Sequence, residues 1–293
     1  MKQTYVFNKE SNREYLFFIA LIPLFIYGLY KNAYLLVSNN YVSAFDGYKI
    51  ILYPLVLTFF GYILSVIFKK KRYELMMYGA LLGFASPFNI NIFIYLFVTG
   101  ISMIAYVFIP NKYRINEAAL MIFIFIVINH FTKTTILYNP MEIGNQYKFT
   151  LFDLFYGRGA SFLFTSSIFW MLIAYLLLIQ IKTYKKEIFI TSIAAYSLLF
   201  LLYMFINHDY TNLLKLYLNG TTFFSFMFIA PINESSPSIN YEIRIYSIII
   251  AIVSFIFVFI FKYLSGAIIA VLITSIIFRV YSIIRQKMFL NRV

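Results

Sequence analysis

The chain has no cysteine among its 293 residues, and it has few charged side chains. The absence of cysteine excludes a disulfide scaffold, a thiol nucleophile and an iron–sulfur cluster with cysteine ligands from this chain. Only 12% of the residues are charged and 62% are hydrophobic, whereas a soluble domain has about 25% charged residues. The 11 acids and 24 bases are too few to cover the surface of a soluble domain of this length. We therefore expect an integral membrane protein in contact with the lipid bilayer.

Long apolar runs recur along the chain, and each predicts a membrane-spanning helix because a bilayer offers no hydrogen-bond partner to the backbone. Eight runs are long enough for a full span: Tyr15–Val37, Ile50–Phe68, Ile92–Ile109, Ala118–Phe131, Ala160–Ile181, Ile188–Ile206, Ile245–Phe261 and Gly266–Ile284. Two further runs are shorter or interrupted, Leu75–Ser86 and Leu213–Ala230, and each stops at a proline, which cannot continue a helix. The pattern predicts an all-α, polytopic membrane protein with about ten transmembrane helices.

The basic residues predict the orientation of the chain. Most of them fall in the N-terminal segment, in alternate loops and at the C-terminus, and the Lys69–Arg72 run is the densest group. Basic loops stay on the cytoplasmic side, so we expect a multi-pass protein of the cell membrane with both termini in the cytoplasm. The net charge of +13 is then explained by membrane anchoring, and we expect no nucleic-acid partner.

The two shorter runs predict an internal repeat. Gly79–Pro87 in the first half and Asn219–Pro231 in the second half both lead to a proline, a polar patch and a full span. Paired interrupted segments of this kind are typical of two inverted five-helix repeats with a site between them. The predicted organisation is a cytoplasmic segment (1–14), a first repeat (15–131), an external loop (132–159), and a second repeat with a basic cytoplasmic C-terminus (160–293). Within the loop, Asp153 and Arg158 are expected to pair.

Several segments, in this order, are similar to those of a known family. They are Gly79–Pro87, Tyr113–Ala119, Phe152–Gly157 with Thr165 and Ser166, Asn219–Thr221, and Gly266–Ala270. Together they resemble the membrane protein shared by two ion-motive electron-transport complexes, which is called RnfD in the Rnf complex and NqrB in the sodium-translocating NADH:quinone oxidoreductase. The chain is identified as a divergent member of this RnfD/NqrB family.

The resemblance implies a flavin cofactor. In the family, flavin mononucleotide (FMN) is attached covalently to a threonine of a Ser-Gly-Ala-Thr-Pro-Leu motif, and Thr135 stands at that position here. The motif is eroded, because Ser-Gly-Ala and the proline are missing and the threonine and Leu137 remain. The other candidate cofactor-binding residues are Thr165, Ser166, Gly220 and Thr221. Hydroxyl groups in membrane helices also bond backbone carbonyls, and glycines also allow close helix packing.

The function implied is that of a membrane subunit of a flavin-linked electron-transport complex that translocates ions, with other membrane subunits as partners. The alternative is a small-solute channel or transporter with the same inverted-repeat fold and no flavin chemistry. The sequence has no phosphate loop, nucleophile elbow or zinc motif, so at most an electron-carrying role is expected. We expect ionisable residues deep within the spans to be nearly absent, with Lys215 and Arg279 as ambiguous cases near span ends, which argues against a self-sufficient proton pump.

Overall fold

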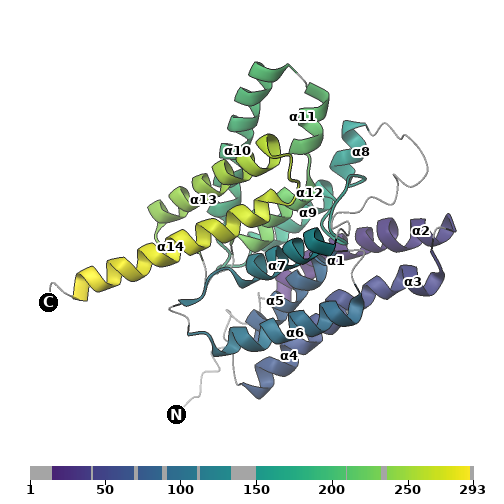
Figure 1. Cartoon of the computed structure of the whole chain (residues 1–293), viewed down its shortest axis with the longest axis horizontal. Coiled ribbons are helices and arrows are strands. Elements are labelled where there is room, and N and C mark those ends of the chain that lie inside the picture. Colours follow the sequence, from purple (N-terminus) through teal and green to yellow (C-terminus); the bar gives the residue numbers. More distant parts are fainter. Residues whose placement is uncertain are drawn as a thin grey trace, which may run out of the picture.

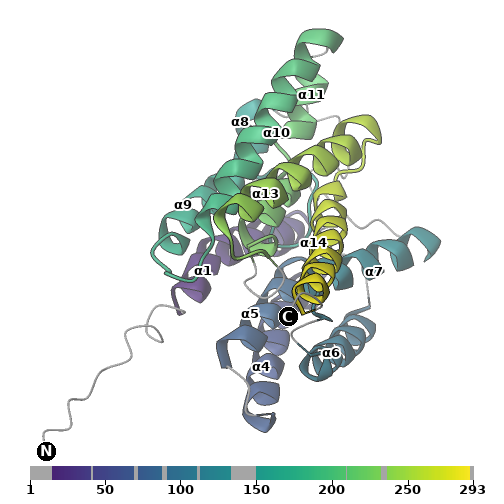
Figure 2. The ribbon, with the colours of Figure 1, turned by 90° about the vertical axis from the view of Figure 1, so that its left-hand side faces the viewer.

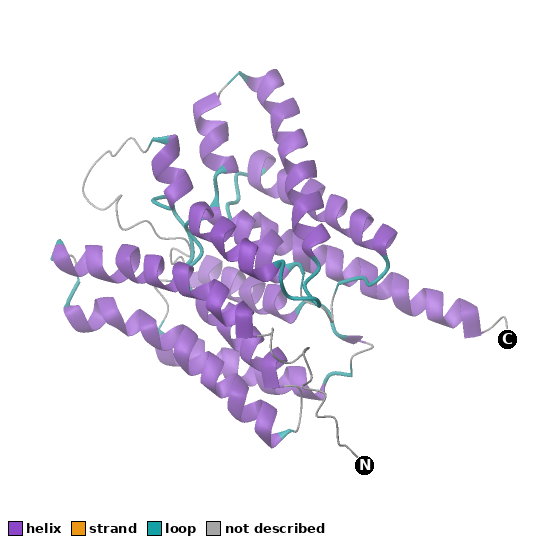
Figure 3. Cartoon of the chain, turned by 180° about the vertical axis from the view of Figure 1, so that it is seen from behind, coloured by secondary structure: helices purple, strands orange, loops and turns teal. Residues whose placement is uncertain are grey.

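The computed structural model describes residues 15–40, 42–68, 72–87, 91–110, 113–132, 150–208, 210–231 and 236–290. Within these ranges the chain consists of helices joined by loops, and no β-strand is present (Figure 3). The predicted all-α class is therefore confirmed. Thr135 lies outside the described residues.

The helices of the described residues follow in chain order. In the first half they are α1 (Tyr15–Leu29), η2 (Tyr30–Tyr34), α2 (Leu35–Ser38), α3 (Ala44–Tyr48), η3 (Lys49–Ile51), α4 (Leu52–Ile67), α5 (Arg72–Phe84), α6 (Ile92–Phe108) and α7 (Glu117–Thr132). In the second half they are α8 (Leu151–Tyr156), α9 (Ile168–Leu178), α10 (Lys186–Asn207), α11 (Tyr210–Tyr217), α12 (Gly220–Phe224), η6 (Ser225–Ile229), α13 (Asn240–Phe255), η7 (Ile256–Ile260) and α14 (Gly266–Leu290). The elements η2, η6 and η7 are π-helical turns.

Many of these helices are long and apolar. Five continuous helical stretches among the described residues have the length and composition to cross a membrane: Tyr15–Ser38, Ala44–Ile67, Lys186–Asn207, Asn240–Ile260 and Gly266–Arg285. Shorter apolar helices are Glu74–Phe84, Ile92–Phe108, Glu117–Ile128 and Ile168–Leu178. The protein is thus a polytopic α-helical membrane protein, while the inverted repeat, the domain boundaries and the side of each terminus stay predictions.

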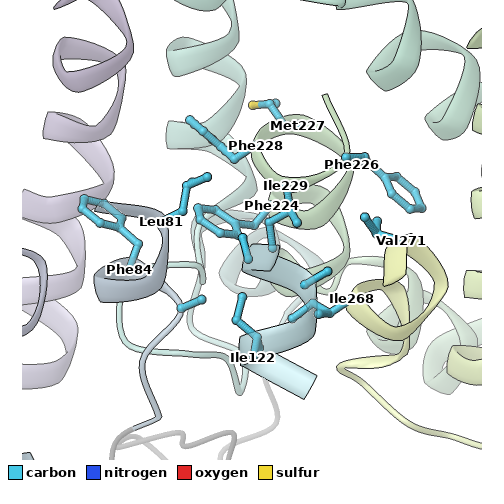
Figure 4. Close-up of a cluster of buried hydrophobic side chains, with 14 of the residues drawn as sticks. Leu81, Phe84, Ile122, Phe224, Phe226, Met227, Phe228, Ile229, Ile268 and Val271 are labelled. Carbon is cyan, nitrogen blue, oxygen red and sulfur yellow. The ribbon is translucent and has the colours of Figure 1, made fainter. Parts of the chain in front are cut away.

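The two halves of the chain form two neighbouring helix groups. In Figure 1 the purple and blue helices α4 and α6 lie below, and the green and yellow helices α10 and α13 lie above. The groups meet where α1 packs on α9 and α7 packs on α14; Figure 2 shows α1 beside α9 from a second direction. A cluster of buried apolar side chains from both halves fills the contact between them (Figure 4). Its members include Leu81, Phe84 and Ile122 from the first half, and Phe224, Phe228, Ile268 and Val271 from the second.

Both predicted interruptions are present. Helix α5 ends at Phe84 ahead of Pro87, and the continuous helix α12–η6 ends at Ile229 ahead of Pro231. We call residues 82–87 the α5 end and residues 227–231 the η6 end. The proline signal therefore predicted both breaks correctly.

The predicted span Ala160–Ile181 is wrong over its first part, because the helix begins only at Ile168. Residues 159–167, which we call the crossing segment, are not helical, although 161–167 are buried. Gly157 ends α8 in the left-handed conformation with φ of 105°, and the Ser167 hydroxyl caps α9 by accepting from the amide of Trp170. Glycine and serine at these positions stop and restart the helix, whereas the apolar residues between them look like a span in composition.

Candidate functional site at the crossing segment

Four of the five candidate residues from the sequence come together in the structure. Thr165 and Ser166 belong to the crossing segment, and Gly220 and Thr221 begin α12. A Cβ atom on Gly220 would lie 2.3 Å from the carbonyl oxygen of Thr165 and 2.4 Å from that of Ser166. Only glycine allows the two backbones to approach this closely. The fifth candidate, Thr135, lies outside the described residues.

The crossing segment is hydrogen-bonded to the α5 end. The amides of Leu163 and Phe164 donate to the carbonyl oxygens of Ser86 and Phe84, each at 3.2 Å. The Tyr95 hydroxyl donates to the carbonyl of Leu82. The last carbonyl groups of a helix have no partner within it, and a membrane protein must satisfy them internally. The crossing segment therefore supplies hydrogen-bond donors to carbonyl groups at the end of α5.

On its other side the crossing segment contacts the π-helical turn η2. Lys31 is fully buried there, and its ammonium group donates to the carbonyl of Gly159 and lies 3.5 Å from the Ser161 hydroxyl. The next residue, Asn32, is 2% exposed and donates from Nδ2 to the carbonyl of Leu163. A lysine inside an apolar span is costly unless it has partners. The oxygen atoms of the crossing segment supply such partners.

Several hydroxyl groups of the crossing segment and of the start of α12 have no hydrogen-bond partner among the described residues. They belong to Thr165, Ser166 and Thr221, whose side chains are at most 4% exposed. A buried hydroxyl that lacks a partner costs about 1–3 kcal/mol. The hydroxyl groups of these residues therefore lack hydrogen bonds in the region where the crossing segment contacts α12.

The η6 end is satisfied by side chains instead. Asn116 caps α7 by accepting from the amide of Ala119 at 3.0 Å, and its Nδ2 donates to the carbonyl of Ile229 at 2.8 Å. The Tyr184 hydroxyl donates to the carbonyl of Met227 at 2.8 Å. The side chains of Asn116, which caps α7, and of Tyr184, in the loop before α10, thus supply hydrogen-bond donors to the end of the second broken helix.

Charged groups lie close to both ends. Arg158, next to the crossing segment, pairs with Asp153 at 2.7 Å, which confirms the predicted pair. Hydrogen bonds from Thr150 lower the pKa of Asp153, and the positive charge of Arg158 lowers it to a smaller extent. Near the η6 end, Lys185 donates to the carbonyl and hydroxyl oxygens of Ser236 at 2.9 and 2.7 Å. Burial lowers the pKa of Lys185 to about 8.

Sequence reasoning missed three of these residues. The expectation that ionisable residues are nearly absent deep in the spans overlooked Lys31, which is fully buried within the first span. A lysine inside the run Tyr15–Val37 was visible as a signal. Asn32 and Asn116 carried no comparable signal, since their acceptors lie far away in the sequence.

A comparison of the sequence with known protein families supports the resemblance that the order of the motifs indicated. The sequence matches the NQR2, RnfD, RnfE family over residues 9–289, which is almost the whole chain. The protein belongs to this family. It is accordingly a membrane subunit of an Rnf- or Nqr-type complex, and its partners include other membrane subunits. A search of curated proteins found no match.

The resemblance to the NQR2, RnfD, RnfE family implies a flavin. A flavin bound between Gly220 and the crossing segment would need space between the two backbones. A Cβ atom does not fit between Gly220 and the crossing segment, so the much larger flavin ring does not fit between these two backbones either. The arrangement offers carbonyl and hydroxyl oxygens at this point. The flavin-binding role of Thr165, Ser166, Gly220 and Thr221 stays a prediction.

Proposed function

We propose that this chain is an electron-carrying membrane subunit of a flavin-linked, ion-translocating complex, with FMN attached at Thr135. We further propose that it lies in the cell membrane with both termini in the cytoplasm. The observation that carries the proposal is the family match over residues 9–289. The flavin would supply the redox chemistry, because the chain has no cysteine to ligate an iron–sulfur cluster.

The test is the detection of covalently bound flavin. Protein purified with its partner subunits from native membranes is separated by denaturing electrophoresis and examined for flavin fluorescence. Thr135→Val should abolish the fluorescent band, whereas Thr134→Val, which changes the neighbouring threonine, should preserve it. A parent protein with no flavin before or after denaturation would contradict the carrier role.

The alternative, a small-solute channel, is favoured by one observation, namely the buried hydroxyls without described partners at the crossing. Against it, the contact between the two halves is filled by large apolar side chains (Figure 4). A channel would need a polar path through this region. Flux of a small solute into liposomes by protein free of flavin would favour the channel, and absence of both flux and flavin would contradict both functions.

A further inference from the structure

The π-helical turn η2 places two polar side chains against the non-helical crossing segment. The backbone amide of Leu35 bonds the carbonyl of Tyr30, so this turn contains one residue more than an α-helical turn. Lys31 and Asn32 in this turn are both buried, although the flanking turns belong to an apolar span. Such turns within α-helices are frequent at functional sites.

The acceptors of these two side chains are regularly spaced. Lys31 contacts Gly159 and Ser161, and Asn32 bonds Leu163, so the contacts fall on every second residue of the crossing segment. One edge of the segment is thus held by side chains of η2.

Few other hydrogen bonds hold the crossing segment, although Phe162, Leu163 and Phe164 pack in the apolar core. The segment's amides bond the α5 end at Leu163 and Phe164. Beyond these, Thr165 and Ser166 have hydroxyls without described partners, and so does Thr221, which follows the closely packed Gly220 in α12. Water would satisfy these hydroxyls if the segment moved away, whereas the closed arrangement leaves them unsatisfied. The contacts from η2 therefore oppose a movement that hydration of the site would favour.

We propose that Lys31 and Asn32 are positioning residues that hold the crossing segment in place and so control access to a buried polar site formed by Thr165, Ser166 and Thr221. We call the contacts of these two side chains with the crossing segment the latch. Release of the latch opens the hydroxyl site to water and to small polar solutes. Lys31 contributes most, because a hydrogen bond from a charged donor is stronger than one from an amide. The latch does not depend on whether a flavin is bound at Thr135.

The absence of cysteine from the chain allows a direct test. Thr165→Cys introduces a single thiol at a fully buried position, and its reaction with a membrane-impermeant maleimide is followed in the full chain within native membranes opened to the reagent from both sides. Adding Lys31→Met should make labelling about tenfold faster, the change expected on losing one charge-assisted hydrogen bond. Adding Lys31→Arg, which keeps the charge and the donors, should return labelling close to the slow rate.

Two matched controls separate the latch from general loosening. Lys49→Met removes a lysine that is exposed and paired with Asp46, and it should leave the Thr165→Cys rate unchanged. Thr274→Cys places the thiol at another fully buried threonine, in α14, where Lys31→Met should not speed labelling.

Unchanged labelling of Thr165→Cys in Lys31→Met would overturn the proposal, as would equal acceleration at Thr274→Cys. Lys31→Gln is the milder variant, with a neutral donor of shorter reach, and it should give an intermediate rate. Loss of both Lys31→Met and Lys31→Gln from the membrane, with Lys49→Met inserted normally, would contradict the latch by showing that Lys31 is required for the fold itself.

Discussion

The α5 end and the η6 end present the same physical problem, because both helices stop inside the protein ahead of a proline. Their last carbonyl groups need donors that water cannot supply. At the α5 end, backbone amides of the crossing segment donate to Phe84 and Ser86, and the Tyr95 hydroxyl donates to Leu82. At the η6 end, the donors are the side chains of Asn116 and Tyr184.

The difference lies in what holds the donors. Asn116 is itself the cap of α7, so its position is set by a long helix. The crossing segment belongs to no helix, and Lys31 and Asn32 hold it from the side. We infer that the η6 end is the rigid closure and the α5 end the adjustable one. Substitutions at both ends can break or sharpen this contrast.

The largest effect is expected at the rigid end. Asn116→Ala removes the α7 cap and leaves the Ile229 carbonyl without this donor, which should lower the free energy of unfolding by about 2–4 kcal/mol. Asn32→Ala removes one amide donor and no cap, so about 1–2 kcal/mol is expected. Thermal unfolding in detergent, followed by the fluorescence of Trp170, the single tryptophan, measures both.

Asn91→Ala is the matched control for the capping part of this effect. Asn91 is exposed and caps α6 by accepting from the amide of Phe93 at 2.9 Å, so its loss should cost about 1 kcal/mol. An equal loss in Asn116→Ala and Asn91→Ala would show that the bond to Ile229 adds nothing to stability. An equal loss in Asn116→Ala and Asn32→Ala would remove the contrast between the two ends.

A smaller effect is expected where the crossing segment touches α12. Gly220→Ala places a Cβ atom 2.3 Å from a backbone oxygen of Thr165, and such overpacking costs about 1–3 kcal/mol. Because the crossing segment is the adjustable partner, we expect it to shift, and a Thr165→Cys reporter should then be labelled faster. A normal melting temperature with unchanged labelling would show that the contact is looser than described.

Gly100→Ala is the control for the glycine substitution. A Cβ atom on Gly100 in α6 would meet the Phe60 ring of α4 at 3.5 Å, an ordinary van der Waals contact. Alanine is the better helix former, so the variant should be as stable as the parent or more stable by up to about 1 kcal/mol. Destabilisation of both glycine variants by the same amount would point to a general effect of added volume.

Part of this site was predictable from the sequence. The prolines 87 and 231 predicted both breaks because proline affects its own helix and the residue before it, and the apolar runs predicted the helices between them. The crossing segment was not predictable in this way, since Phe162, Leu163 and Phe164 are as apolar as any span. Its conformation depends on acceptors and donors in α5 and η2, which only the folded chain brings near.

The smallest effect concerns the charge beside the η6 end. Burial lowers the pKa of Lys185 to about 8, whereas a lysine in an unfolded chain has a pKa of about 10.4. Between these values the unfolded chain binds more protons than the folded one, so stability rises with pH. The gain in the free energy of unfolding should be about 1 kcal/mol between about pH 8 and about pH 9.

Lys185→Gln should remove this rise, and Lys182→Gln, at an exposed lysine of the same loop, should keep it. A rigid closure keeps Lys185 buried across this pH range, so a parent protein whose stability is flat there would show that the η6 end admits water and is no more rigid than the α5 end.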